Sequence, residues 1–166
     1  MTSPGTTDKL AAALAANPDG ILEHIAADNG VSTFDVVRSL PDECRTILPG
    51  ERFEAVMQSL TAWGEVLFIV HTSDIVLECK GSIPPGSMAR GYFNIHGDSP
   101  ISGHIKAANC RHIAFVDRPF MGRRSLSLQF FNEAGEAMFK IFVRRDEHRE
   151  LVAEQVARFE TLRTSH

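Results

Sequence analysis

The sequence predicts an α+β fold: a large coiled antiparallel β-sheet flanked by N-terminal and C-terminal helices. Three observations support it. Helical hydrophobic spacing occupies the first third of the chain, short apolar or alternating runs separated by turn residues follow, and the last twenty residues again show a helical stripe. At 166 residues and 43% hydrophobic content we expect one domain, 1–166, with a helical N-terminal extension (1–48) and a sheet-plus-helix core (49–166).

The extension is expected to contain three short helices, each ended by a turn residue or a proline. Their expected bounds are Thr7 or Asp8 to Ala16, residues 21–29 before Gly30, and a helix capped by Ser32 that ends at Pro41. The last two resemble a helix-turn-helix, but residues 1–50 carry seven acidic and only three basic side chains. Because a DNA reader needs Lys and Arg against phosphates, a helical hairpin packed on the main domain or on a second subunit is favoured over DNA binding.

The core is expected to begin with an amphipathic helix and to continue as a series of antiparallel strands. The helix spans residues 51–62, and the strands are residues 66–70 (ending at His71), 74–80, 91–96, 102–107, 112–117, 125–131 and 137–144. Residues 81–88 hold two prolines and two glycines and are expected to form a loop. In the strand 125–131, leucine and phenylalanine at alternate positions should face the core, and Asp146 should cap a final helix.

Composition excludes several classes of protein. A net charge of −4 and a pI near 6.0 give no reason to expect nucleic acid or an anionic membrane as a partner. We find no apolar run long enough to span a membrane and no secretory signal at the N-terminus. Three cysteines without a CxxC pair indicate free thiols. These observations favour the reducing cytoplasm as the location.

Motifs of common enzymes are missing. The sequence has no GxGxxG, GxxxxGK[ST], HExxH or GxSxG, and its carboxylates are scattered or lie in turns, so no general acid/base pair is suggested. We therefore expect a binding protein, and we assign no catalytic residue.

The most unusual chemistry lies in one stretch in the middle of the chain. The only tyrosine, Tyr92, is followed by Asn94 and His96, and because strand side chains alternate, these three would point to the same side. A five-residue loop (97–101) would place His104 opposite Asn94 and on that face, whereas a four-residue loop would turn His104 to the other side. The sequence does not choose between the two registers.

Histidines on a sheet face beside apolar surface and a tyrosine suit a flat, hydrophobic, iron-bearing macrocycle, since haem iron accepts His nitrogen or Tyr oxygen. Four histidines lie in or at the ends of expected strands: His71, His96, His104 and His112. The porphyrin propionates need basic partners, for which the candidates are Lys80, Arg90, Lys106, Arg123 and Arg124. Each has a structural alternative: His112 is more typical of a half-buried residue, His71 could serve either role, and Tyr92 could be a core aromatic.

Longer segments resemble one family. The runs WGEV (63–66), LECKG (77–81), GYFNIHGD (91–98), SGHI (102–105) and FVDRPFMGRRS (115–125) are similar to those of the HutX/ChuX family of intracellular haem-utilisation carrier proteins, along nearly the whole chain. Ile95 stands where the family pattern has leucine. The resemblance implies a saddle of antiparallel strands like one half of the larger HemS/ChuS-type proteins, assembled as a homodimer.

The same resemblance implies a role and a set of ligands. It implies a cytosolic carrier or storage protein that binds haem and hands it to a haem-degrading partner. It implies that His71 and His104 bind haem and that Tyr92 is a candidate axial ligand, and the position of His96 beside Tyr92 adds a further candidate. Because no CxxCH motif is present, we expect non-covalent haem b. The alternative is a haem-degrading, oxygenase-like enzyme on the same scaffold.

Overall fold

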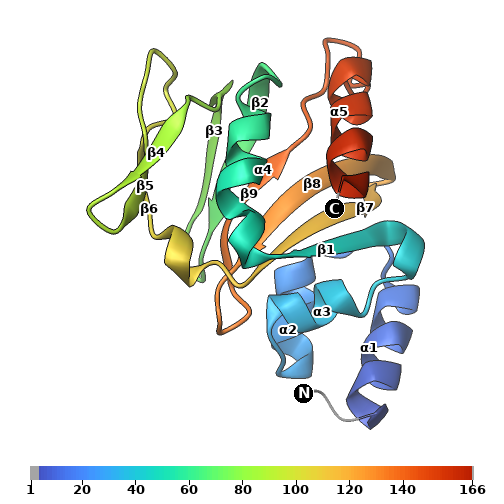
Figure 1. Cartoon of the computed structure of the whole chain (residues 1–166). Coiled ribbons are helices and arrows are strands. Elements are labelled where there is room, and N and C mark those ends of the chain that lie inside the picture. The colour runs from blue at the N-terminus through green and yellow to red at the C-terminus, as the bar shows by residue number, and fades with distance from the viewer. Residues whose placement is uncertain (1–3, 166) are drawn as a thin grey trace.

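The computed structural model describes residues 4–165 and contains two antiparallel sheets (Figure 1). In this part of the chain the larger sheet has six strands in the order β1-β7-β8-β9-β2-β3, and the smaller has three in the order β4-β5-β6. The strands are β1 (Arg45–Pro49), β2 (Glu65–His71), β3 (Val76–Ser82), β4 (Gly86–Ala89), β5 (Tyr92–Ile95), β6 (Gly103–Ile105), β7 (His112–Phe120), β8 (Arg123–Phe131) and β9 (Ala137–Phe142). The predicted α+β fold with a large antiparallel sheet is confirmed.

Within residues 4–165, five α-helices flank the sheets: α1 (Pro4–Ala16), α2 (Leu22–Asn29), α3 (Thr33–Arg38), α4 (Phe53–Leu60) and α5 (Ala153–Thr164). Figure 1 shows α1–α3 grouped at one end of the six-stranded sheet and α4 and α5 beside its other strands. The predicted N-cap of α3 is present as a reciprocal capping box, because the Ser32 side chain accepts from the Asp35 amide while the Asp35 carboxylate accepts from the Ser32 amide.

The two faces of the six-stranded sheet are covered by different helices. One face packs against α4, α5 and the small sheet, with Phe53, Phe130 and Phe139 at the centre of that core. The other face packs against α1–α3, but only at the β7 and β8 end, where Val116 and Phe131 join the helical side chains. In the described part of the chain, no helix covers the β9, β2 and β3 part of this second face, and a cavity forms there.

Three local features differ from the expected elements. Strand β1 was not expected; it forms because β7 offers a free edge, and an edge strand tolerates Pro49. Strand β4 begins at Gly86, inside the expected loop 81–88, and ends at Ala89, because β5 pairs with it. The last helix begins at Ala153 rather than after Asp146, whose Oδ1 instead accepts from the amides of His148 and Glu150 in a turn.

The three cysteines are free, as predicted. Burial raises the pKa of the Cys110 thiol to about 11, although hydrogen bonds to the backbone act in the opposite direction. The Cys110 thiol is therefore protonated and unreactive at neutral pH.

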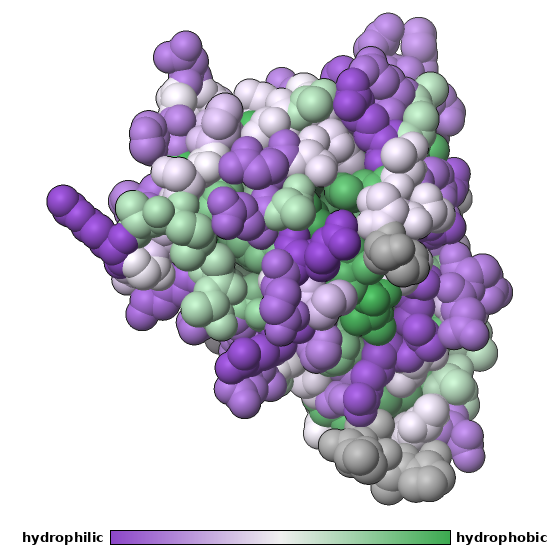
Figure 2. Space-filling view, in the orientation of Figure 1, coloured by the Kyte–Doolittle hydropathy of each residue, from purple (hydrophilic) through white to green (hydrophobic). Residues whose placement is uncertain are grey.

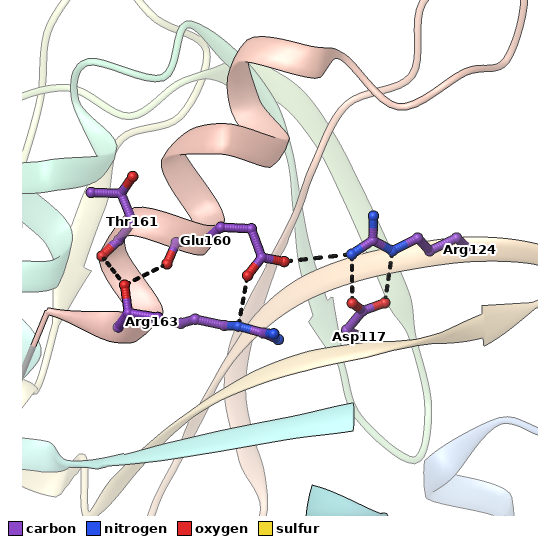
Figure 3. Close-up of polar contacts among 6 residues, drawn as sticks. Asp117, Arg124, Glu160, Thr161 and Arg163 are labelled. Atoms are coloured by element: carbon purple, nitrogen blue, oxygen red, sulfur yellow. Dashed lines mark hydrogen bonds and ion pairs between the residues drawn. The ribbon is translucent and has the colours of Figure 1, made fainter. Parts of the chain in front are cut away.

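A small ion-pair network joins the β7–β8 hairpin to α5 (Figure 3). The Arg124 guanidinium donates to both oxygens of Asp117, at 3.0 and 2.6 Å, and lies 3.5 Å from Glu160 Oε1. Glu160 in turn pairs with Arg163 at 2.9 Å. The hydrogen bonds to Asp117 raise the pKa of Arg124 further above its ordinary value.

We expect Arg124→Gln to lower the free energy of unfolding by less than about 1 kcal/mol, because Arg124 is half exposed and surface ion pairs are screened. The effect should shrink further at about 1 M salt. Urea unfolding at low and high salt measures both. The matched control is Arg158→Gln, which removes a single exposed pair with Glu154 and should cost about 0.3 kcal/mol. Equal losses in the two variants would contradict a network contribution.

Candidate functional site

Two of the predicted site residues, Tyr92 and His104, lie together on the exposed face of the small sheet, and a third, Lys106, lies just beyond its last strand. The pairing of β5 with β6 places Asn94 directly opposite His104, which is the register that the five-residue loop requires. Tyr92, Asn94, His104 and Lys106 therefore share one face, and we call them the outer-face cluster. The Tyr92 and His104 rings are 6.0 Å apart in an edge-to-face arrangement. The Lys106 Nζ lies 5.6 Å from the centre of the Tyr92 ring.

The His104 imidazole is held by its neighbour across the strand pair. His104 Nδ1 and Asn94 Oδ1 are 2.6 Å apart. Because an amide oxygen only accepts, Nδ1 carries the proton, and the neutral ring presents its lone pair at Nε2. No group within residues 4–165 is hydrogen-bonded to that nitrogen, so it is available to a metal.

An apolar groove of about 510 Å³ lies beside the outer-face cluster, between the small sheet and strands β2, β3 and β9. His104 and Lys106 contribute to its lining. Its walls are otherwise mainly hydrophobic and include Phe68, Val70, Leu77, Cys79, Ile101 and Phe139. In Figure 2, pale green hydrophobic surface is visible where Figure 1 places the small sheet, among strongly hydrophilic residues. Apolar walls with a nitrogen donor and one cation are the features that a porphyrin requires.

Two other predicted residues lie at the edge of this region. His96 follows the end of β5 and is exposed, and Arg90 is at the tip of the β4–β5 hairpin with φ 55°. In the described part of the chain neither lines the groove. Both can reach a ligand only at its periphery.

His71 lies elsewhere, in a cavity of about 480 Å³ on the opposite face of the six-stranded sheet. We call this the sheet cavity. Its floor is a row of residues that pair from strand to strand: Leu67 of β2, Phe142 of β9, Ser127 of β8 and Val116 of β7. The start of α2 forms one wall of the cavity. Five basic residues are part of the cavity lining: Lys80, Arg118, Lys140, Arg144 and Arg145.

Partly buried polar contacts join α2 and the turn before it to the strands below. The Arg118 guanidinium donates to the carbonyl oxygens of Pro18 and Gly20, each at 2.6 Å. The Lys140 ammonium forms an ion pair with Glu23, and His71 Nδ1 lies 3.6 Å from the same carboxylate. Burial alone raises the pKa of Glu23, but Lys140 outweighs it by charge and hydrogen bonding, so the pKa is lowered from its ordinary value of 4.5.

The two loci cannot share one iron within a single chain. Along β2, Phe68 and Val70 face the groove, whereas Leu67, Ile69 and His71 face the sheet cavity. A packed sheet therefore separates His71 from His104. Sequence reasoning placed both histidines on the central sheet but could not assign them to different faces.

His112 agrees with its structural alternative. It stacks on Phe34 with ring centres 4.2 Å apart, and burial together with the Arg38 charge lowers its pKa. Sequence reasoning missed Lys140 and Glu23. Lys140 gave a signal, as the single charge in an otherwise apolar strand, whereas Glu23 gave none because only the packing of α2 brings it to the sheet.

Residues 4–165 contain neither a ready-made metal cluster nor a membrane-spanning helix. No cluster of three or more His, Cys, Asp or Glu side chains is arranged to hold a metal ion by itself. Among the helices of this range, none is both long and apolar enough to cross a membrane.

Comparison with known proteins gives a consistent set of relatives. The family model for haem utilisation ChuX/HutX matches residues 46–162. The chain is 41% identical to the intracellular heme transport protein HutX of Vibrio cholerae over 143 residues, which cover 86% of this chain and 74% of that protein.

Solved structures agree with the sequence match. A protein from Erwinia carotovora is 48% identical with a TM-score of 0.90, covering 93% of this chain and 96% of its own. The heme-binding protein ChuX is 46% identical with a TM-score of 0.87, covering 94% and 97%. ChuS, an E. coli heme oxygenase, is 13% identical with a TM-score of 0.77, and this chain covers 48% of it. The ChuS likeness supports the fold alone, in agreement with the predicted relation to one half of such proteins.

Proposed function

This chain belongs to the ChuX/HutX haem-utilisation family, and from that premise we propose that it is an intracellular haem carrier. It binds haem and passes it on without degrading it. Support comes from the two relatives above 40% identity, one named a heme transport protein and the other a heme-binding protein. The relative described as an oxygenase is too distant to favour the enzymatic alternative.

The observation that carries the proposal is the free Nε2 of His104 at an apolar groove. Haem needs a donor atom for iron, hydrophobic walls for the porphyrin and cations for the propionates. The groove and the outer-face cluster offer all three, with Lys106 as the nearest cation. The Tyr92 ring, whose centre is 6.0 Å from that of His104, offers a phenol oxygen as a second donor, and tyrosine oxygen is a known ligand of haem iron. His96 and Arg90 would contact only the edge of the ligand.

His71 enters the proposal through a second copy of the chain. Since the six-stranded sheet lies between His71 and the small sheet that carries the outer-face cluster, both can ligate one iron only if two chains associate. We propose a homodimer in which the porphyrin has the sheet cavity of one subunit on one side and the groove of its partner on the other. A two-fold axis would then create two equivalent sites.

The proposal also covers the type of haem, the cellular location, the haem acceptor and the domain organisation. The haem is b-type and non-covalent, because no CxxCH sequence is present to attach it. The carrier works in the cytoplasm and releases haem to a haem-degrading partner, which an exposed iron ligand such as His104 would permit. We propose that residues 1–166 form one domain, since side chains of α1–α3 and of β7 and β8 share one core.

The experiment that tests the proposal is a titration of the purified protein with ferric haem, followed by absorbance. We expect a saturable Soret shift in the parent protein at micromolar concentration. The haem affinity obtained from this titration should fall at least about tenfold in the double variant Tyr92→Phe/His104→Ala. Loss of an outer-shell partner of a metal ligand already has an effect of this size, and here the ligands themselves are removed. His148→Ala, on an exposed turn, is the matched control and should bind like the parent, because His148 lines neither the groove nor the sheet cavity. A parent protein without saturable binding would overturn the carrier function.

A further inference from the structure

Asn94 is fixed in one orientation by the hairpin that surrounds it. Its Nδ2 donates to the carbonyl oxygens of Tyr92, Ala89 and Ser87 at 3.0, 3.1 and 3.3 Å. A reversed amide would place Oδ1 against these three oxygens, none of which can donate a hydrogen bond. The amide oxygen is therefore the atom that faces His104.

The anchor of Asn94 is the turn of the β4–β5 hairpin. Ala89 and Tyr92 pair across that turn, whose two central residues, Arg90 and Gly91, have φ values of 55° and 81°. Positive φ at both positions is typical of a two-residue turn that matches the strand twist. The carbonyls that hold Asn94 thus belong to the β4–β5 hairpin itself.

The orientation of Asn94 determines the tautomer of His104. With Oδ1 2.6 Å from Nδ1, the imidazole proton must lie on Nδ1, and the lone pair lies on Nε2. Histidines that bind metals usually donate their other ring N–H to such an oxygen, which fixes the ring plane and raises the basicity of the ligating nitrogen. Asn94 and His104 have this arrangement already in the protein alone.

We propose that Asn94 is a positioning residue for iron coordination. It holds the His104 ring in the Nδ1–H tautomer, so that Nε2 is presented toward the haem iron, and it does so through the β4–β5 turn. This inference rests on the proposed function, because it gives Asn94 a role only if His104 reaches the iron. It goes further in assigning a second residue that does not touch the ligand.

The first test needs no haem. Long-range proton–nitrogen NMR correlations of the imidazole, recorded at alkaline pH, distinguish the two tautomers of His104 in the apo protein. We expect the Nδ1–H form in the parent and a shift toward the Nε2–H form in Asn94→Ala. Asn94→Asp keeps an acceptor oxygen and should keep the proton on Nδ1. Ser87→Ala, which leaves its carbonyl in place on the same hairpin, is the matched control and should resemble the parent. An unchanged tautomer in Asn94→Ala would overturn the inference.

The second test uses bound haem. Asn94→Ala should bind haem about tenfold to a hundredfold more weakly, and Asn94→Asp should recover most of the affinity. In the reduced complex of a His71→Ala background, which leaves His104 as the one histidine donor of the proposed site, the iron–histidine stretching band should fall in frequency when Asn94→Ala is added, because Nδ1 no longer donates to the Asn94 oxygen. Amide dispersion in the NMR spectrum checks that each variant is folded.

The outcomes separate the two proposals. If the parent binds haem but Asn94→Ala has the same affinity and the same iron–histidine band, the positioning role is wrong and the carrier function stands. If the parent shows no saturable binding, the carrier function fails, and the role of Asn94 toward iron fails with it. The apo tautomer result then still reports whether Asn94 controls His104.

Discussion

Replacement of Lys140 by methionine is expected to lower the free energy of unfolding by about 3 kcal/mol at pH 7, because it leaves the Glu23 carboxylate without its partner in a largely buried place. The side chain of Lys140 is 7% exposed and that of Glu23 is 20% exposed, so water relieves only part of the loss. Removing one member of such a pair is costly, whereas removing both is often nearly neutral. Urea unfolding of the parent, Lys140→Met and the double variant Glu23→Gln/Lys140→Met measures the effect.

The control is the double variant, which should recover most of the lost stability because no unpaired charge remains. It also separates the ion pair from packing, since methionine keeps the length of the lysine stem. If the double variant is as unstable as Lys140→Met, the loss comes from packing of the stem rather than from the stranded carboxylate.

The same pair predicts a pH dependence. The pKa of Glu23 is lowered in the folded protein, so its contribution to stability is present above the ordinary value of 4.5 and is lost as the pH falls through the lowered folded value. In Lys140→Met, burial without the ammonium raises the pKa of Glu23, and protonation then relieves the stranded charge. The stability difference between parent and variant should therefore narrow between pH 7 and pH 4. A constant difference over this range would contradict the assignment.

Haem ligation across two subunits predicts that complementary variants restore one another. His71→Ala lacks the donor of the sheet cavity, and Tyr92→Phe/His104→Ala lacks the donors of the outer-face cluster. Alone, each should lose the six-coordinate low-spin signal of the ferric complex. A heterodimer of the two should regain about half of the parent signal, because one of its two equivalent sites then has every donor intact. Tandem purification with two different tags, followed by absorbance and electron paramagnetic resonance, measures it.

Each variant purified with both tags on identical chains is the control and should remain without the low-spin signal. A heterodimer that also lacks the signal would show that His71 and the outer-face cluster do not serve one iron. Haem would then be held by a single locus, and the single variants would show which one. A parent protein that is monomeric with haem bound would contradict the intersubunit site directly.

Much of the architecture could be predicted from local patterns. Apolar residues at alternate positions from Leu126 to Phe130 identified β8, and turn residues separated it from β7 and β9. Ser32 identified the start of α3 by its capping chemistry. Local reasoning missed β1 and β4. Strand β1 depends on an edge offered by a distant strand, and short sequence windows do not contain that information.

In the candidate site too, some features could be predicted from the local sequence and others depend on the tertiary structure. Alternation correctly placed Tyr92 and Asn94 on one face, because the period of a strand is local. The face of His104 depended on the hairpin register, which the sequence left open. The ion pair of Glu23 with Lys140 joins residues more than a hundred positions apart, so only the folded chain could reveal it.

By itself, the sequence determined the family, the helix–sheet–helix order and the residue types that suit haem, because these depend on motifs and on short-range periodicity. Only the tertiary structure decided that the six-stranded sheet separates His71 from His104, which lies on the small sheet, that Asn94 holds His104 in one tautomer, and that α1–α3 leave part of a sheet face open. Those outcomes depend on strand register and on which helix covers which face, and both are set by contacts between residues far apart in the chain.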